Sequence, residues 1–311
     1  MNNNNFTIIS FYQFRQLKNI NFLKNFFKEF CSFHKIRGTV LLAPEGINGA
    51  LAGFNKSIKF FEKEIISHGF NNLEFKYSHH KFMPFNRLKI KIKDEIITFS
   101  KTKLNVENNT ATYVNSKDWN HLIEDKNTLV LDVRNQFEYE LGTFKNSLNP
   151  NIKKFSEFKN FLNKKFSFRK YKQIAMFCTG GIRCEKASSY MLKKGFKNLY
   201  QLKGGVLKYL EDIPKNNSRW NGECFVFDNR VSVKNELAPG TYILCYGCRM
   251  PLSKEERKSN KHENGVSCPK CFNFLSYSKK KNLRERNKQI QIAKKKGIYN
   301  PYIKYTPLNF L

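Results

Sequence analysis

Two cysteines, Cys178 and Cys184, lie six positions apart in the segment FCTGGIRCEK. Between them, Gly180 and Gly181 allow the backbone to curl so that successive N–H groups point at one place. Arg183 adds a positive charge. Such surroundings favour thiolate over thiol and lower a cysteine pKa from about 8.5 into a range of roughly 3.5 to 7.5. The pattern therefore predicts a reactive thiol at Cys178, in a loop that also suits an anionic adduct such as a persulfide.

Two alternatives accompany this interpretation. An inert cysteine at a strand end is the plainer explanation of Cys178, and the glycine pair and the arginine argue against it. Cys184 is either a resolving thiol or a small residue that packs under the loop, and packing is favoured. A disulfide is disfavoured because the chain begins without a secretory signal pattern, and reducing compartments keep thiols free.

The segments before and after this loop predict where Cys178 lies in the fold. The apolar run QIAMFC predicts a buried strand, and EKASSYMLKKGF predicts a helix. Strands alternating with helices indicate a parallel sheet, here expected over residues 113–214. Cys178 then lies at the carboxyl end of a strand, where open α/β sheets bind ligands, and the next helix directs its positive end towards it.

The N-terminal part has a different pattern. Strands are expected at residues 6–14, 38–43 and 44–53, and helices at residues 22–33 and 56–68. Two further strands are expected at residues 73–78 and 87–99. This order predicts a ferredoxin-like α/β sandwich with an added strand over residues 1–105, and a polar linker at residues 101–111.

Three motifs in order resemble a rhodanese domain: VLDVRNQFEYELGTF, CTGGIR and LKGGVLKYL. The resemblance implies that Cys178 carries a persulfide intermediate, and that Asp132 and Arg134 belong to the frame near the active-site loop. Many rhodaneses have a Gly-His pair in the first motif, whereas this chain has Gly142 and Thr143.

That departure fits a narrower group, because the chain up to about residue 275 resembles the TrhO family of rhodanese-domain tRNA uridine(34) hydroxylases. The likeness includes APEGINGALAG, KFMPFNRLKIKIKDEI and WNGECFVFDNRVSV. It implies an oxidoreductase that uses molecular oxygen to convert the wobble uridine of tRNA to 5-hydroxyuridine, with Cys178 as the catalytic residue and Gly180, Gly181 and Arg183 supporting the loop. The alternatives are a sulfurtransferase that passes persulfide sulfur to a small molecule or protein, and a non-enzymatic thiol or zinc module.

Four other cysteines form two CxxC pairs, CYGC and CPKC, with 19 residues between the pairs. This spacing is typical of a structural zinc site, in which four thiolates complete a closed tetrahedral shell. His262 is a ligand only if one cysteine is not, and scattered reduced cysteines are the alternative. The site would stabilise a small lobe over residues 215–275, with ligands Cys245, Cys248, Cys268 and Cys271.

The formal net charge of +31 favours a polyanionic partner such as tRNA, although about half of the excess fits drift in an AT-rich genome. Phosphate contacts are expected from one face of an alternating strand and from a basic tail at residues 276–311. No apolar run approaches the roughly 18 residues that span a membrane. The sequence therefore predicts a cytoplasmic protein, and it indicates no obligate protein partner. The basic candidates are Lys89, Lys91, Lys93, Lys279, Lys280, Lys281, Arg284 and Arg286.

Overall fold

The computed structural model describes residues 5–99, 104–163 and 171–297. Its N-terminal domain is a five-stranded sheet in the order β4-β1-β3-β2-β5, with the first four strands antiparallel and β5 parallel to β2. This is the ferredoxin-like order with one added strand, as the sequence predicts. Its elements are β1 (Phe6–Phe14), α1 (Ile20–Phe33), β2 (Arg37–Ala43), β3 (Gly46–Gly53), α2 (Asn55–Ser67), β4 (Lys76–His80) and β5 (Leu88–Ile92).

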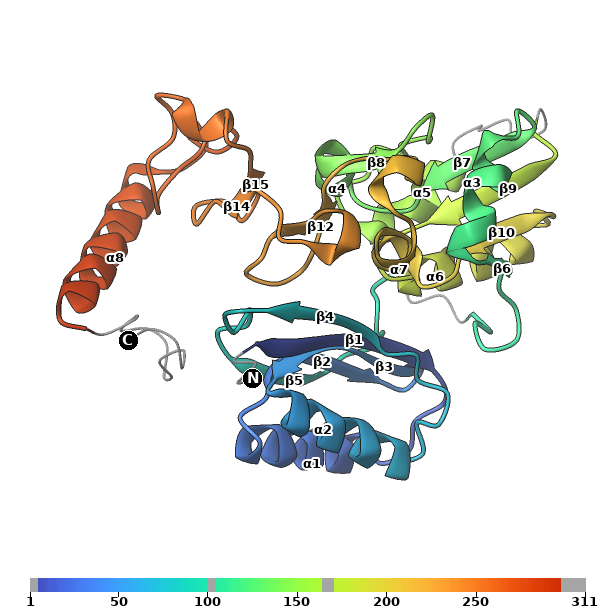
Figure 1. Cartoon of the computed structure of the whole chain (residues 1–311), viewed down its shortest axis with the longest axis horizontal. Helices are drawn as coiled ribbons and strands as arrows, with labels where there is room; N and C mark the ends of the chain where they lie inside the picture. The colour runs from blue at the N-terminus through green and yellow to red at the C-terminus, as the bar shows by residue number, and fades with distance from the viewer. Residues whose placement is uncertain (1–4, 100–103, 164–170, 298–311) are drawn as a thin grey trace.

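The two helices cover one face of this sheet (Figure 1). Apolar residues repeat along α1 so that Leu23, Phe27 and Cys31 are buried. They pack against alternate residues of β1, including Ile9 and Phe11. Because side chains alternate across a strand, the even-numbered residues of β1 lie on the other face, which α1 and α2 leave uncovered.

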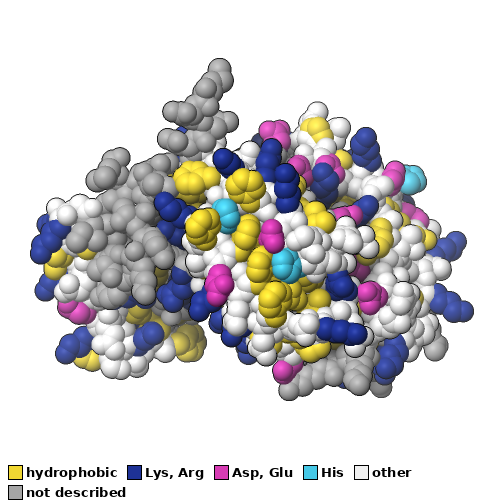
Figure 2. All heavy atoms as spheres, turned by 90° about the horizontal axis from the view of Figure 1, so that it is seen from below, with side chains coloured by type: hydrophobic (Ala, Val, Ile, Leu, Met, Phe, Trp, Pro, Cys, Tyr) yellow, Lys and Arg dark blue, Asp and Glu magenta, His cyan; other side chains and the backbone are white. Residues whose placement is uncertain are grey.

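The outer surface of the two helices is partly apolar. Figure 2 shows hydrophobic side chains and two histidines gathered on this side of the molecule, with Lys and Arg around them. Phe33 is the most exposed of the aromatic residues there, at 82%, and Phe22 is 60% exposed.

The strand expected at residues 87–99 is wrong in its extent, because β5 ends at Ile92. Beyond that point the backbone leaves the sheet, and the Ile96 N–H donates to Glu45 Oε1 at 2.7 Å. Phe99 is fully buried in the core of the second domain. Alternation alone could not reveal this, because the last apolar residues of the segment pack on a different domain.

The second domain has a parallel sheet in the order β6-β10-β9-β7. This agrees with the parallel α/β arrangement expected from the sequence. Its strands are β6 (Thr112–Val114), β7 (Thr128–Asp132), β9 (Gln173–Phe177) and β10 (Leu199–Leu202), and its helices are α3 (Ser116–Glu124), α4 (Gln136–Leu141), α5 (Phe158–Asn163), α6 (Ile182–Lys193) and α7 (Gly205–Asp212). The short strand β8 (Gly142–Phe144) pairs outside this sheet with β11 (Trp220–Gly222).

The remainder forms a small lobe and a helix. Two hairpins pair β12 (Cys224–Phe225) with β13 (Ser232–Val233), and β14 (Ile243–Leu244) with β15 (Pro251–Leu252). The basic tail begins with helix α8 (Tyr277–Lys295). Residues 298–311 of that tail and residues 101–103 of the expected linker lie outside the described residues. Among the residues described, no helix has the length and apolar character needed to cross a membrane.

The uncovered face of the N-terminal sheet is turned towards the second domain (Figure 1). A buried lysine connects the N-terminal domain to the second domain. Lys186 Nζ on α6 lies 2.7 Å from Glu45 Oε1 and 2.7 Å from Glu95 Oε1, and it donates to the Ile97 carbonyl. Removing one partner of a buried ion pair is costly, so these contacts hold the sheet against the domain that carries Cys178.

Candidate active site

The thiol of Cys178 lies directly after β9, at the carboxyl end of the strand. The Gly181 N–H donates to Cys178 Sγ at 3.1 Å. Gly181 has a φ of 103°, which favours glycine, and a side chain there would meet the Tyr12 hydroxyl. Helix α7 supports the loop from below, because the Val206 N–H donates to the Cys178 carbonyl at 3.0 Å. The loop geometry expected from the sequence is therefore present, although the Cys178 residue is only 1% exposed.

The surroundings stabilise the Cys178 thiolate. Burial by itself raises the pKa of Cys178, but contacts from Cys184, the charge of Arg183 and backbone N–H groups outweigh it and lower the pKa to about 5. Burial and the neighbouring thiolate raise the pKa of Cys184 well above its usual value. Cys184 is thus a protonated thiol facing Cys178, in addition to being fully buried.

Alkylation of Cys178 by iodoacetamide should increase as the pH rises through about 5 and then level off, because the thiolate is the reacting form. A Cys184→Ala variant should shift this midpoint to higher pH, since it removes a contact that lowers the pKa of Cys178. Mass spectrometry of the Cys178 peptide measures both effects. Cys31, whose pKa burial raises to about 12, is the internal control and should stay unmodified. A wild-type midpoint near 9 would contradict the prediction.

Arg183 does not stand free beside the thiol. Its guanidinium binds both carboxylate oxygens of Glu138, with distances of 2.6 and 2.8 Å, and also donates to Thr179 Oγ1 at 3.0 Å. Thr179 in turn donates to Glu138 Oε1 at 3.0 Å. Glu138 is fully buried. It holds Arg183 in place under the loop, and spacing around Cys178 could not identify it because it comes from α4.

Asp132 and Arg134, which the rhodanese likeness assigns to the frame of the active-site loop, lie next to the pair of Glu138 and Arg183. Arg134 and Asp132 form a fully buried ion pair at 2.5 Å, and Arg134 also donates to the Gly142 carbonyl. Thr143 Oγ1 donates to Asp132 Oδ2 at 3.0 Å and contacts Ser147 Oγ at 2.7 Å. The Gly-Thr pair that departs from the usual motif therefore takes part in the hydrogen bonding of Asp132.

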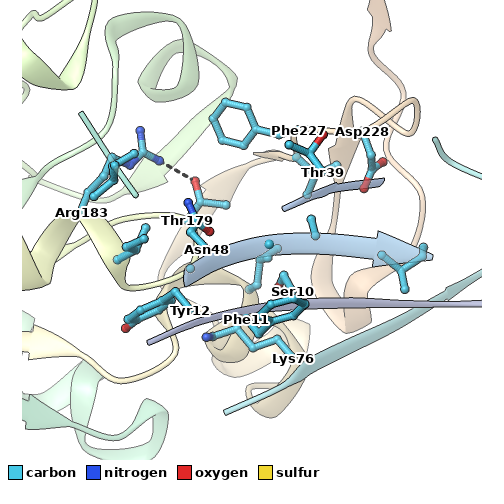
Figure 3. Close-up of a pocket in the computed structure, with 18 of the residues that line it drawn as sticks. Ser10, Phe11, Tyr12, Thr39, Asn48, Lys76, Thr179, Arg183, Phe227 and Asp228 are labelled. Carbon is cyan, nitrogen blue, oxygen red and sulfur yellow. Dashed lines mark hydrogen bonds between the residues drawn. The ribbon is translucent and has the colours of Figure 1, made fainter. Parts of the chain in front are cut away.

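A cavity of about 690 Å³ lies between the thiol loop and the uncovered face of the N-terminal sheet. Thr179 and Gly180 line it from the loop, and Tyr12 and Lys76 line it from the sheet (Figure 3). A side chain at Gly180 would meet nothing within 4 Å, so the loop faces open space at that residue. The size falls within the range of about 300 to 1,000 Å³ that is usual for small-molecule sites.

Tyr12 joins the sheet to the thiol loop through a buried carboxyl group. The hydroxyls of Tyr12 and Tyr113 donate to Glu185 Oε1 at 2.8 and 2.9 Å, and the Gln201 amide donates to Glu185 Oε2 at 3.3 Å. Burial raises the pKa of Glu185, although these donors oppose the shift. Glu185 directly follows Cys184, so the two domains meet one residue from the thiol pair.

Lys76 places a basic group in the same cavity. Its ammonium lies 5.1 Å from the centre of the Tyr12 ring. Burial lowers the pKa of Lys76, and the charges of Glu74, Cys178 and Glu185, which act in the opposite direction, offset only part of this shift. Strand alternation was a usable signal for Tyr12 and Lys76, because Ser10 pairs with Lys76 and the even-numbered residues of β1 share its face. Which face meets the second domain was not readable from the sequence.

The expected phosphate-binding residues lie in two separate places. Lys89 and Lys91 pair with Thr39 and Leu41 of β2, which line the cavity, so they lie on that face of the sheet. Arg284 on α8 is instead paired with Glu263 at 2.7 Å. The remaining candidates in the tail, Lys279, Lys280, Lys281 and Arg286, belong to α8.

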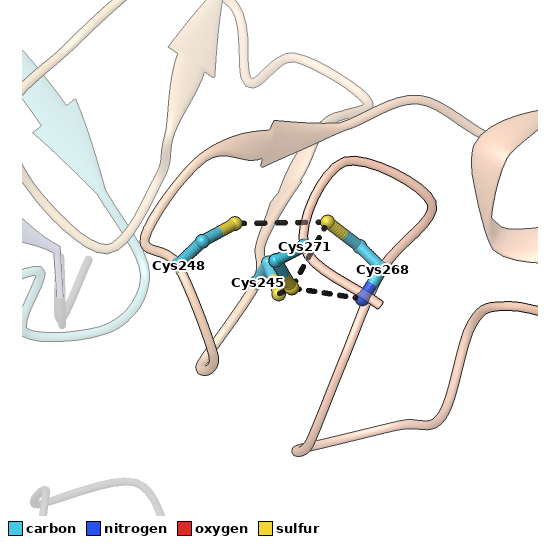
Figure 4. Close-up of side chains that lie close together, drawn as sticks. All are labelled: Cys245, Cys248, Cys268 and Cys271. Atoms are coloured by element: carbon cyan, nitrogen blue, oxygen red, sulfur yellow. Dashed lines mark hydrogen bonds between the residues drawn. The ribbon is translucent and has the colours of Figure 1, made fainter. Parts of the chain in front are cut away.

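The four cysteines of the CxxC pairs converge in the C-terminal lobe (Figure 4). Their sulfur atoms all lie within 4.8 Å of one another, and three of the separations are 3.6, 3.7 and 3.8 Å. Four sulfurs at 2.3 Å from a tetrahedral zinc ion are about 3.8 Å apart, so the donor set fits this metal. Gly247 is required here because a side chain would collide with the Val266 carbonyl. His262 Nδ1 contacts the Arg257 carbonyl instead.

A parallel sheet that presents a stabilised thiolate in a glycine loop after its strand defines the chain as a rhodanese-domain protein. Residues 116–212 match the rhodanese-like domain family, and residues 6–96 match the UPF0176 acylphosphatase-like domain family. Among solved structures, a rhodanese-related protein from Thermoplasma volcanium is similar at 29% identity, over 33% of this chain and 95% of that chain, with a TM-score of 0.28.

Full-length relatives define the family more narrowly. The chain is 47% identical to a tRNA uridine(34) hydroxylase of Pelagibacter ubique, over 94% of this chain and 96% of the relative. Proteins of the same name from Teredinibacter turnerae and Bartonella bacilliformis are 43% and 46% identical, over 94% and 93% of this chain and 91% and 95% of theirs. The chain belongs to the tRNA uridine(34) hydroxylase family.

Proposed function

We propose that this protein hydroxylates the wobble uridine of tRNA at C5, with molecular oxygen as co-substrate and Cys178 as the catalytic residue. The observation that carries the proposal is the likeness to the named hydroxylases along nearly the whole chain, at 47% identity for one of them. The cavity supports it, because a plain sulfurtransferase needs no second domain beside its thiol loop. The enzyme would act in the cytoplasm, on tRNA.

In the proposed reaction, the Cys178 thiolate acts as a nucleophile that activates the uracil ring towards oxygen. Cys178 Sγ would bond to C6 of the uracil ring, and the electron pair of the C5–C6 double bond would move onto C5 and O4. C5 would then bond to molecular oxygen, and the terminal oxygen would take up one proton from solvent to give a hydroperoxide. A two-electron donor such as a dithiol, with two protons, would reduce the hydroperoxide to hydroxyl and water. Loss of the C5 proton would finally release Sγ from C6.

Residues around the cavity suit this sequence of steps. The low pKa of Cys178, about 5, makes the thiolate the resting form at neutral pH. We assign Gly180, Gly181 and Arg183 to the support of the loop, the last through Glu138. Lys76 would offset the negative charge that develops on the ring, since opposite charges attract more strongly away from water. Lys89, Lys91 and Lys93 would contact phosphates outside the cavity.

Mass spectrometry of tRNA nucleosides tests the function. Cells that lack this protein should lose 5-hydroxyuridine at position 34, and its reintroduction should restore the nucleoside. Purified protein, oxygen, a reductant and unmodified tRNA should produce it in vitro. If 5-hydroxyuridine is unchanged by the deletion and the protein instead transfers sulfur from thiosulfate to a small acceptor, the hydroxylase proposal fails in favour of a sulfurtransferase.

We propose that the four clustered cysteines hold one structural zinc ion that stabilises the C-terminal lobe. A Cys268→Ser variant should lose the bound zinc, and proteolysis within residues 240–275 should accelerate, because this lobe has a small apolar core of its own. Metal analysis by mass spectrometry gives the stoichiometry. The His262→Ala variant is the control and should keep one zinc per chain. Wild-type protein purified without zinc, yet equally resistant to protease, would contradict the proposal.

A further inference from the structure

One segment that the thiol chemistry leaves unused is FVFDNR at residues 225–230, which joins β12 to β13. It forms a third side of the cavity, together with the thiol loop and the N-terminal sheet. Val226, Phe227, Asp228 and Arg230 all line that space. Figure 3 shows Phe227 and Asp228 across the cavity from Tyr12 and Lys76.

The polar groups of this segment are engaged in holding it in position. Arg230 binds Asp228 Oδ2 at 2.6 Å and donates to Ser78 Oγ on β4 at 2.8 Å. The Asn229 N–H donates to the Pro84 carbonyl at 2.9 Å, and its side-chain amide donates to Asn86 at 2.8 Å. The segment is thus bound to the N-terminal domain at several points, so its conformation is well determined.

Phe227 is the exception, because its ring projects from this anchored segment and remains 66% exposed. One edge of the ring is supported by Phe225, with ring centres 5.0 Å apart and planes at 89°. Phe225 is itself buried and packs in the same edge-on manner against Phe137. Leaving a phenylalanine largely in water forgoes most of the stabilisation that burial of its ring would contribute. A supported, exposed ring at a cavity edge is a surface on which a flat ligand can stack.

We propose that Phe227 stacks on a nucleobase of the substrate RNA that neighbours the modified uridine. This rests on the proposed function, and it extends the binding site from one base to two. Single-stranded RNA is held by aromatic side chains that stack on its bases and by cations that meet its phosphates. Lys76 and Lys154 line the same cavity, and the net charge of +31 favours a polyanionic partner. The cavity, at about 690 Å³, is large enough for more than one base.

The test uses a stem-loop RNA with an anticodon loop, uridine at position 34 and fluorescent 2-aminopurine at position 33 or 35. In the wild-type protein, stacking should quench one of the two probes. Phe227→Ala and Phe227→Leu should abolish the quenching and weaken RNA binding by about 5-fold or more, the effect of losing one stacked base. Phe227→Trp should retain both properties. The rate at saturating RNA should change little, because the ring does not touch the reacting atoms.

Phe33→Ala is the matched control, since Phe33 is exposed on α1, in the layer that covers the opposite face of the sheet. It should bind and quench as the wild type does. If the wild type hydroxylates the RNA but Phe227→Ala binds it equally tightly, the stacking proposal is wrong and the proposed function stands. If Phe227→Leu binds the RNA as tightly as the wild type does, the contribution of residue 227 is apolar contact and not ring stacking, and the proposal is also overturned. A wild type that neither binds nor hydroxylates the RNA would overturn both.

Discussion

Replacement of Cys178 by serine is expected to reduce 5-hydroxyuridine formation by at least about 10³-fold, with the free energy of unfolding nearly unchanged. The thiolate is lost, and a serine hydroxyl is far too weakly acidic to replace a nucleophile whose pKa is about 5. Nucleoside mass spectrometry after incubation with unmodified tRNA, oxygen and a reductant measures the rate. Thermal unfolding of the same sample establishes that the variant is folded.

Two other cysteines serve as comparisons for this result. Cys184→Ser should retain part of the activity, because it changes the pKa of Cys178 without removing the nucleophile. Cys31→Ala, in the core of the N-terminal domain, should remain as active as the wild type. An active Cys178→Ser protein together with an inactive Cys184→Ser protein would assign the chemistry to the other thiol.

Glu138→Ala is expected to lower the free energy of unfolding by about 3 to 5 kcal/mol, the cost of removing one partner from a buried ion pair. The substitution leaves Arg183, a residue that is only 5% exposed, without the carboxylate that binds its guanidinium at 2.6 and 2.8 Å. It also removes the acceptor for Thr179 Oγ1 in the thiol loop. Urea denaturation followed by circular dichroism measures the loss.

Glu124→Ala provides the matched control, because Glu124 pairs with Arg219 at the surface, with side chains 51% and 44% exposed. Removing that pair should cost at most about 1 kcal/mol. If Glu138→Ala is no less stable than Glu124→Ala, the buried pair does not support the loop. The charge-preserving Glu138→Asp variant should fall between the two, because its shorter side chain cannot reach Arg183 as well.

Local features of this protein were predictable from short stretches of sequence. The loop CTGGIR was recognisable because β9, the glycines and α6 are adjacent in the chain, although distant residues such as Glu138 help to hold it in place. The two CxxC pairs likewise specify a compact four-sulfur cluster through their spacing, and the sulfurs do lie within 4.8 Å of one another. The order of the N-terminal sheet followed from the order of helical and alternating patterns.

Features that depend on long-range contacts were missed. Glu138 binds Arg183 across 45 positions, and Tyr12 meets Glu185 across 173. The expected strand at residues 87–99 was too long because Phe99 packs in the core of the other domain. Phe227 was included in a segment of family likeness, but its exposure depends on contacts of its neighbours with Ser78 and Pro84.

The sequence by itself determined the position of Cys178 in a glycine loop after a strand, the four-cysteine cluster and the two α/β domains, because each depends on patterns within a few to a few tens of residues. Tertiary structure alone decided what the loop after Cys178 faces. The sheet could have presented its uncovered side to solvent, and alternation along β1 would have looked the same. Buried contacts between the domains, above all those of Lys186 with Glu45 and Glu95, place that side over the loop and so create the cavity.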